Sequence, residues 1–153
     1  MKPLYYHYPP RDTSNLPKYR LLISFESDKI ILMIKGIGID ICDIKRFKKA
    51  IKNNSKFLAR IFSAGEIAYC RGKKNSVLHY AGRFAVKEAF IKAVSTDKSV
   101  PLNEIEVIND RFGKPEIALT PRIRAMLKAK RGKKFSLSIS HTHDAAAAVC
   151  VIT

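Results

Sequence analysis

The sequence predicts an α+β domain in which a small antiparallel sheet packs on one long central helix. Residues 77–94 are rich in strong helix-forming side chains, which predicts the long helix. Residues 33–39 are typical of a buried strand, and its two glycines, Gly36 and Gly38, predict that another part of the backbone approaches it closely. Residues 135–140 and 145–152 alternate as an antiparallel pair of strands does. With 153 residues, 46% of them hydrophobic, the chain is long enough to enclose one core of this kind.

Shorter elements are expected around this centre. Asp43 is predicted to cap a short helix that places Ile44 and Phe47 on an apolar side. Ser63 and Glu66 form the capping-box pattern, which predicts a second helix that runs to residue 71. The other expected elements are strands at 105–108 and 116–119, with a turn between them, and a last helix that begins at Pro121.

The first 32 residues differ from the rest of the chain. They hold four of the seven prolines and a net charge of +2 (5 basic minus 3 acidic), whereas residues 33–153 carry +14 (24 minus 10). No helix pattern or signal-peptide pattern occurs in them. We therefore predict an N-terminal extension over 1–32 that activity does not need, followed by one domain over 33–153. Met33 is also a candidate for the natural start.

The charge of the chain predicts an anionic partner. Lys and Arg number 29 against 13 Asp and Glu, a net charge of +16. The apolar runs are much shorter than a membrane span needs, so no membrane partner is expected. The three cysteines, Cys42, Cys70 and Cys150, lack the spacing of a disulfide framework or a zinc site, which is typical of a protein of the reducing cytoplasm.

Two carboxylates stand at positions where a charge is costly. On the long helix, Ala81, Phe84, Ala85 and Glu88 fall on one face, which is apolar apart from the carboxylate. A salt bridge is the simpler interpretation of Glu88, and a bound cation is the other. Asp40 is expected to end the first strand, either as a helix-capping residue or as a second ligand.

Taken together, these two carboxylates suit a hard cation such as Mg²⁺, because no Cys or His accompanies them. Arg83, Lys87 and Lys92 lie near Glu88 in the sequence and could hold phosphate oxygens. A metal with cations around it is the combination that chemistry on a diphosphate requires.

Several segments, in this order, resemble the holo-acyl-carrier-protein synthase family of small 4'-phosphopantetheinyl transferases. The resemblance covers residues 33–153, and the pair of segments GIGID and GRFAVKEA at this separation is its most specific part. The segments that carry it are GIGIDICDIKRF at 36–47, RIFSAGEIAYC at 60–70, AGRFAVKEAFIKA at 81–93, FGKPEIAL at 112–119 and SLSISHTHDAAAAVCVI at 136–152.

This resemblance implies a fold like that of 4'-phosphopantetheinyl transferases and a reaction in fatty acid biosynthesis. The phosphopantetheine arm of coenzyme A would move to a serine of an apo-acyl carrier protein, with release of adenosine 3',5'-bisphosphate. The base that takes the serine proton stays open among Asp40, Glu88 and a metal-bound water.

The same resemblance implies roles for individual residues. The ligands of Mg²⁺, for which Mn²⁺ would substitute, and the catalytic carboxylates fall on Asp40 and Glu88. Carriers are acidic, and the helix that docks them falls on residues 44–53. The coenzyme A contacts fall on Arg83, Lys87, Lys92 and His141, and the carrier contacts on Arg46, Lys45 and Lys49.

The resemblance further implies a homotrimer with each site between two subunits. In that arrangement Asp40 and Glu88 come from one subunit and His141 from its neighbour.

Two other classes compete with this interpretation. A small basic RNA-binding protein would explain the charge, but the chain lacks the glycine–aromatic pattern of RNA-recognition motifs, so no nucleic-acid partner is expected. A non-enzymatic module that docks acidic proteins would explain the charge equally well. The stretch 125–134 is unusually basic for a metabolic enzyme, which leaves room for a further polyanion contact.

Overall fold

The computed structural model describes residues 33–54, 56–95 and 100–153, all within the unit that spans 32–153. The predicted extension 1–32 lies outside the described residues, so the division at residue 33 stays a prediction. The strands are β1 (Gly36–Asp43), β2 (Val107–Asn109), β3 (Pro115–Ile117), β4 (Phe135–His141) and β5 (Ala145–Ile152). The helices are α1 (Ile44–Asn53), α2 (Phe57–Ile61), α3 (Ala64–Arg71), α4 (Ser76–Val94) and α5 (Pro121–Ala129), with a 3-10 turn at Leu102–Glu104.

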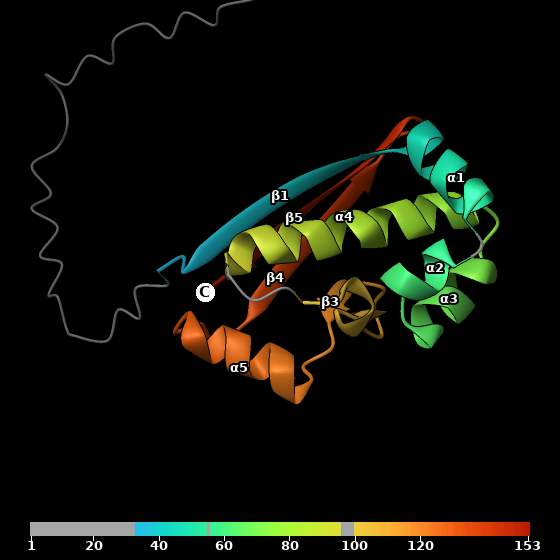
Figure 1. The fold of residues 1–153 in the computed structure, drawn as a ribbon. Helices are drawn as coiled ribbons and strands as arrows, with labels where there is room; N and C mark the ends of the chain where they lie inside the picture. The colour runs from blue at the N-terminus through green and yellow to red at the C-terminus, as the bar shows by residue number, and fades with distance from the viewer. Residues whose placement is uncertain (1–32, 55, 96–99) are drawn as a thin grey trace, which may run out of the picture. The chain divides into compact units, whose positions relative to one another are not determined.

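An antiparallel sheet of three strands, in the order β1-β5-β4, packs against the long helix α4 (Figure 1). In the central strand β5, Ala146, Ala148, Cys150 and Ile152 alternate with less buried residues and face the core. The small side chains of Ala146, Ala148 and Cys150 let α4 lie close to the sheet. The predicted α+β class, with its small antiparallel sheet on a long central helix, is therefore confirmed.

Two glycines decide how closely α4 approaches β1. A methyl group built at Gly36 would clash with the carbonyl oxygen of Ala93, and one built at Gly38 with that of Ala89. The close backbone approach predicted at these two positions is thus made by α4. It brings the C-terminal half of α4, with Glu88 on it, alongside the middle of β1.

The predicted caps are present. The Asp43 carboxylate accepts a hydrogen bond from the backbone N–H of Arg46 at 2.7 Å, at the start of α1. Ser63 and Glu66 exchange the two hydrogen bonds of a capping box at the start of α3. These local bonds satisfy N–H groups that the first helical turn leaves without a partner, which is why short-range sequence patterns located them.

The first strand differs from its prediction. β1 continues through Asp43, so Asp40 lies within the strand, opposite Ala148, and does not end it. Pairing with β5 keeps residues 41–43 in the strand. Because β5 lies about 100 residues later in the sequence, the residues near Asp40 do not reveal this pairing. α2, which the sequence pattern did not predict, precedes Phe62, a buried aromatic residue of the core.

Among the described residues, no helix has both the length and the apolar character that crossing a membrane requires.

Candidate active site

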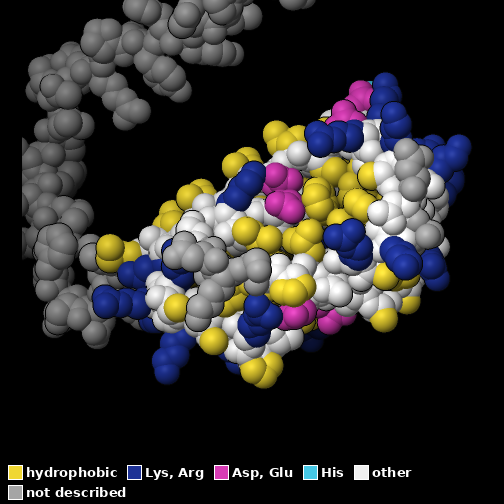
Figure 2. Space-filling view, viewed as in Figure 1, with side chains coloured by type: hydrophobic (Ala, Val, Ile, Leu, Met, Phe, Trp, Pro, Cys, Tyr) yellow, Lys and Arg dark blue, Asp and Glu magenta, His cyan; other side chains and the backbone are white. Residues whose placement is uncertain are grey.

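Asp40 and Glu88 come together where β1 crosses α4. Burial, and then the negative charge of Asp40, raise the pKa of the Glu88 carboxyl above its ordinary value, so the two carboxylates sense each other's charge. Lys92 lies one helical turn beyond Glu88. Its ammonium group donates hydrogen bonds to the Asp40 carboxylate and to the backbone carbonyl of Ile39, both at 2.8 Å. Figure 2 shows an acidic patch beside hydrophobic side chains on this face of the molecule.

The carboxylate pair opens onto a groove of about 500 Å³. Phe47, Phe57 and Phe84 give the groove an apolar wall, and Arg46 of α1 lines its other side. The side chain of Lys92 is half exposed, so it can leave Asp40 for a ligand in the groove. The groove therefore extends from the two acids, one of which is bonded to Lys92, to the start of a basic helix.

The donor set of this pair fits a divalent cation such as Mg²⁺. Two carboxylates that repel each other are stabilised by a hard cation between them, and Mg²⁺ completes its shell with water or phosphate oxygens when a protein offers only one or two carboxylates. Among the described residues, no cluster of three or more His, Cys, Asp or Glu side chains suits a metal, so such a site would rest on this pair.

Lys87 does not lie where its predicted contact with coenzyme A requires. Its side chain is fully buried, and its ammonium group donates to Glu66 at 2.7 Å and to the carbonyls of Leu102 and Ile105 at 2.8 and 2.6 Å. All three donors are therefore used inside the core. A direct contact with coenzyme A does not suit this position, and we leave Lys87 out of the ligand set proposed below.

Arg83 faces a second pocket, of about 210 Å³, away from the carboxylate pair. Its guanidinium group lies 3.9 Å from the centre of the Tyr69 ring and donates a hydrogen bond to the Asn109 side chain at 2.5 Å. The side chain is almost fully buried, yet its Nε has no hydrogen-bond partner. A buried cation with an unused donor is suited to an anionic ligand.

His141 belongs to the surroundings of Arg83. Burial lowers the pKa of His79, and the charges of Arg83, Lys73 and His141 lower it further, so these three groups lie in one cluster around His79, whose neutral form this arrangement favours. Glu88 and Arg83 are five residues apart on α4, which turns them about 140° away from each other around the helix axis. The structure thus brings Asp40, Glu88 and Lys92 together, and it turns Arg83 away from them toward the cluster around His79, which includes His141.

The predicted carrier-docking residues Arg46, Lys45 and Lys49 are all exposed on α1. Arg46 borders the groove, whereas Lys45 and Lys49 do not line it. Residue patterns did not reveal Tyr69, Asn109 and His79, which complete the surroundings of Arg83. Tyr69 and Asn109 belong to α3 and β2, so only the fold places them beside Arg83, whereas His79 lies one helical turn before Arg83 on α4.

Comparison with known proteins decides the family. The family model described as "4'-phosphopantetheinyl transferase superfamily" matches residues 36–150. The chain belongs to this superfamily. A holo-[acyl-carrier-protein] synthase of Geotalea daltonii is 43% identical over 123 residues, which cover 78% of this chain and 98% of that protein.

Solved structures of other transferases have the same fold. The holo-[acyl-carrier-protein] synthase of Neisseria meningitidis superposes with a TM-score of 0.73 at 34% identity, covering 79% of this transferase and 99% of that chain. The synthase of Helicobacter pylori, solved in complex with coenzyme A, gives a TM-score of 0.65 at 34% identity and covers 76% and 99%. These matches confirm the predicted family and its enzyme class.

Proposed function

We propose that this transferase moves the 4'-phosphopantetheine arm of coenzyme A to a serine of an apo-acyl carrier protein, in fatty acid biosynthesis. The observation that carries this proposal is the Asp40–Glu88 pair, which borders a groove between α4 and the basic helix α1. The serine oxygen forms a new bond to the phosphorus of the arm. The bond from that phosphorus to the bridging oxygen breaks, adenosine 3',5'-bisphosphate leaves, and the hydroxyl proton goes to a base.

In this proposal Asp40 and Glu88 hold Mg²⁺, for which Mn²⁺ substitutes. When bound, the ion would supply positive charge that stabilises the diphosphate as its bond breaks. Lys92 adds a movable cation on the same side, 2.8 Å from Asp40. Arg83 and His141 bind phosphate groups of coenzyme A, which is supported by the unused Nε donor of Arg83 and by the cluster of Arg83, Lys73 and His141 around His79.

The test of this function is mass spectrometry of a purified apo-carrier protein after incubation with the full chain, coenzyme A and Mg²⁺. We expect the carrier to gain the mass of one phosphopantetheine, and no gain in the presence of a chelator. An unchanged carrier mass across several acyl carrier proteins would reject the proposal. A gain that persists under chelation would reject only the metal.

We propose that α1 docks the carrier. Carriers are acidic, and Arg46, Lys45 and Lys49 present positive charge beside the groove. Charge reversal in Arg46→Glu/Lys49→Glu should raise KM for the carrier and leave KM for coenzyme A unchanged. Lys130→Glu/Lys134→Glu is the matched control, because it changes the net charge equally in the segment between α5 and β4. An equal rise of KM for coenzyme A would place α1 at the nucleotide instead.

We also propose that the active enzyme is a homotrimer with its sites between subunits. Ile37, Ile39 and Ile41 form a stripe on the outer side of β1, and each is more than 60% exposed. A stripe of this kind supports a subunit interface. The separation of the two groups of site residues on α4 supports a site that a second copy completes.

Two further expectations concern the chain as a whole. We propose that residues 1–32 are dispensable, because the family match begins at residue 36. Deletion of 1–32 should leave turnover unchanged, and a loss of activity would reject this proposal.

We propose a reducing, cytoplasmic location. All three cysteines are free and buried, and burial raises the pKa of Cys42 and Cys70 to about 11 and that of Cys150 to about 12.

A further inference from the structure

One end of the main sheet brings together two segments that are far apart in the sequence, 33–35 and 128–134, which we call the basic end. The backbone N–H of Lys35 donates to the carbonyl of Ile152 at 2.7 Å. On the other side of β5, the N–H groups of Lys133 and Lys134 donate to the carbonyl of Thr153 at 2.5 and 3.1 Å. The two segments therefore flank the last residues of β5.

The basic end is rich in positive charge. It carries six Lys and Arg residues and no Asp or Glu. Among the residues that the structure describes, none of these six takes part in an ion pair. The uncompensated cations are Lys35, Lys128, Lys130, Arg131, Lys133 and Lys134.

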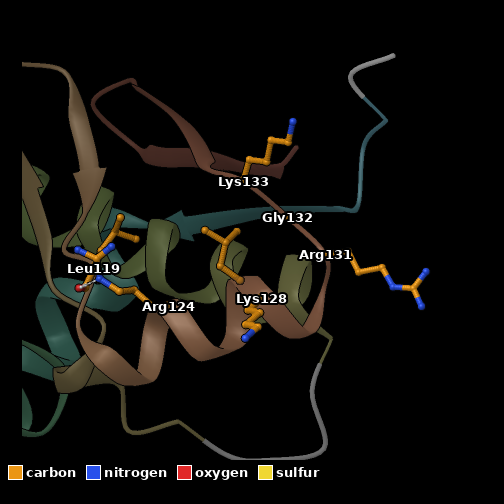
Figure 3. Close-up of a pocket in the computed structure, with 7 residues that line it drawn as sticks. Leu119, Arg124, Lys128, Arg131, Gly132 and Lys133 are labelled. Carbon is orange, nitrogen blue, oxygen red and sulfur yellow. Dashed lines mark hydrogen bonds between the residues drawn. The ribbon is translucent and has the colours of Figure 1, made fainter. Parts of the chain in front are cut away.

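Three of these cations surround a shallow pocket of about 390 Å³ whose apolar lining includes Leu127. Figure 3 shows Lys128, Arg131 and Lys133 extending away from the pocket in different directions. They do not converge on one point, as they would around a small phosphorylated ligand. Their spread suits an extended anionic surface.

Exposed apolar side chains accompany the cations. Met33 is 59% exposed and Ile34 61% exposed, immediately before Lys35. Neither lies on the stripe of Ile37, Ile39 and Ile41 that we propose for the subunit interface. Figure 2 shows hydrophobic and basic side chains side by side at the end of the molecule where β1 begins.

We propose that the basic end binds the surface of a bilayer that contains anionic lipids. Lys and Arg near such a surface are attracted by its negative potential, and exposed aliphatic side chains enter the boundary between headgroups and acyl chains. Nucleic acid explains the observations less well. The basic end has no aromatic side chain on which a base could stack, and a phosphate backbone would leave Met33 and Ile34 without a role.

This inference departs from the sequence-based expectation of no membrane partner, which considered only segments that span a bilayer. It also predicts an orientation. β1 runs from the basic end to α1, a distance of roughly 26 Å for eight extended residues. A transferase held at a bilayer by its basic end would keep α1 in water, where a carrier can reach it.

The test is sedimentation of the full chain with vesicles of phosphatidylcholine alone and of phosphatidylcholine with one quarter phosphatidylglycerol. We expect binding to the anionic vesicles only. Lys128→Gln/Lys133→Gln should weaken it by about 30-fold, since each cation contributes about fivefold. The control Lys56→Gln/Lys74→Gln removes the same charge from exposed sites elsewhere and should change binding less than about threefold.

The apolar part of the proposal has its own test. Ile34→Ser should weaken vesicle binding several-fold and leave the binding of a fluorescent DNA duplex unchanged. Equal losses in both double variants would mean attraction by net charge alone and would overturn the proposal. Vesicle binding that is unchanged in Ile34→Ser would also overturn the proposal. The same holds if Lys128→Gln/Lys133→Gln weakens only the binding of DNA and not that of vesicles. Thermal melts check folding, and Lys130→Gln/Lys134→Gln replaces the first variant if it does not fold.

Discussion

At the scale of single residues, the groove depends on two acids whose positions have different origins. Glu88 is placed by the helical repeat of α4, which the sequence reveals directly. Asp40 is placed by the pairing of β1 with β5, which the sequence does not reveal. The sequence predicts a salt bridge for Glu88. In the structure Asp40 makes the salt bridge instead, with Lys92 at 2.8 Å.

Asp40→Ala and Glu88→Ala should each lower turnover by more than about 100-fold, as the loss of a group that stabilises transition-state charge does. Both variants should still fold, because neither carboxylate is part of the core. Transfer to a carrier is the measurement, and Glu116→Ala, on exposed β3, is the control. Turnover near the wild-type value in either variant would remove that residue from the site.

Glu88→Gln should raise the melting temperature at neutral pH in a buffer that contains a chelator. The folded-state pKa of Glu88 is raised above its usual 4.5, so the ionised form weakens the fold once pH exceeds that pKa, and a neutral Gln avoids this cost. The gain should vanish below about pH 4.5, where the carboxyl is protonated in both states. Calorimetric scans from pH 4 to 8 measure it, with Glu116→Gln as the control. A gain that persists in acid would assign the effect to packing.

At the scale of elements, the contact between α4 and β1 positions the site. Gly36 and Gly38 allow this contact. The sequence predicted that a backbone segment would approach both glycines, but it did not reveal that this segment is α4. The caps at Asp43 and Ser63 and the extent of α4 were also predictable, because their signals lie within a few residues.

Lys87 was not predictable in the same way. Its partner Glu66 lies 21 residues earlier, on α3. The sequence shows a lysine next to Glu88 on a helix, whereas only tertiary packing shows that it points into the core. The surroundings of Arg83 escaped prediction for the same reason, since Tyr69 and Asn109 reach it from α3 and β2.

Gly38→Ala should destabilise the fold by about 1–3 kcal/mol or more, because the added methyl group meets the carbonyl of Ala89. It should also lower turnover in the fraction that stays folded, as α4 moves away from β1 and Glu88 from Asp40. Chemical denaturation and the carrier assay measure the two effects. Gly72→Ala is the control, since a methyl group there makes only ordinary contacts. Equal stability of the two variants would contradict the close contact.

At the scale of the whole molecule, the two groups of site residues face different directions. Asp40 and Glu88 border the groove beside α1, and Lys92 is bonded to Asp40, whereas Arg83 and His141 lie in the cluster around His79. Coenzyme A has its reacting diphosphate and its nucleotide at different points along its length. A second subunit that presents its cluster to the groove would let one molecule of coenzyme A reach both groups, which is the central claim of our account.

Complementation tests this claim most directly. The Asp40→Ala and His141→Ala proteins, each impaired alone, are unfolded together, refolded as mixed oligomers and assayed for transfer to an apo-carrier. Some interfaces in the mixture join an intact Asp40–Glu88 side to an intact His141 side, so we predict that activity reappears well above that of either protein refolded alone. No recovery, when native mass spectrometry shows that the subunits have mixed, would mean that all these residues act within one subunit.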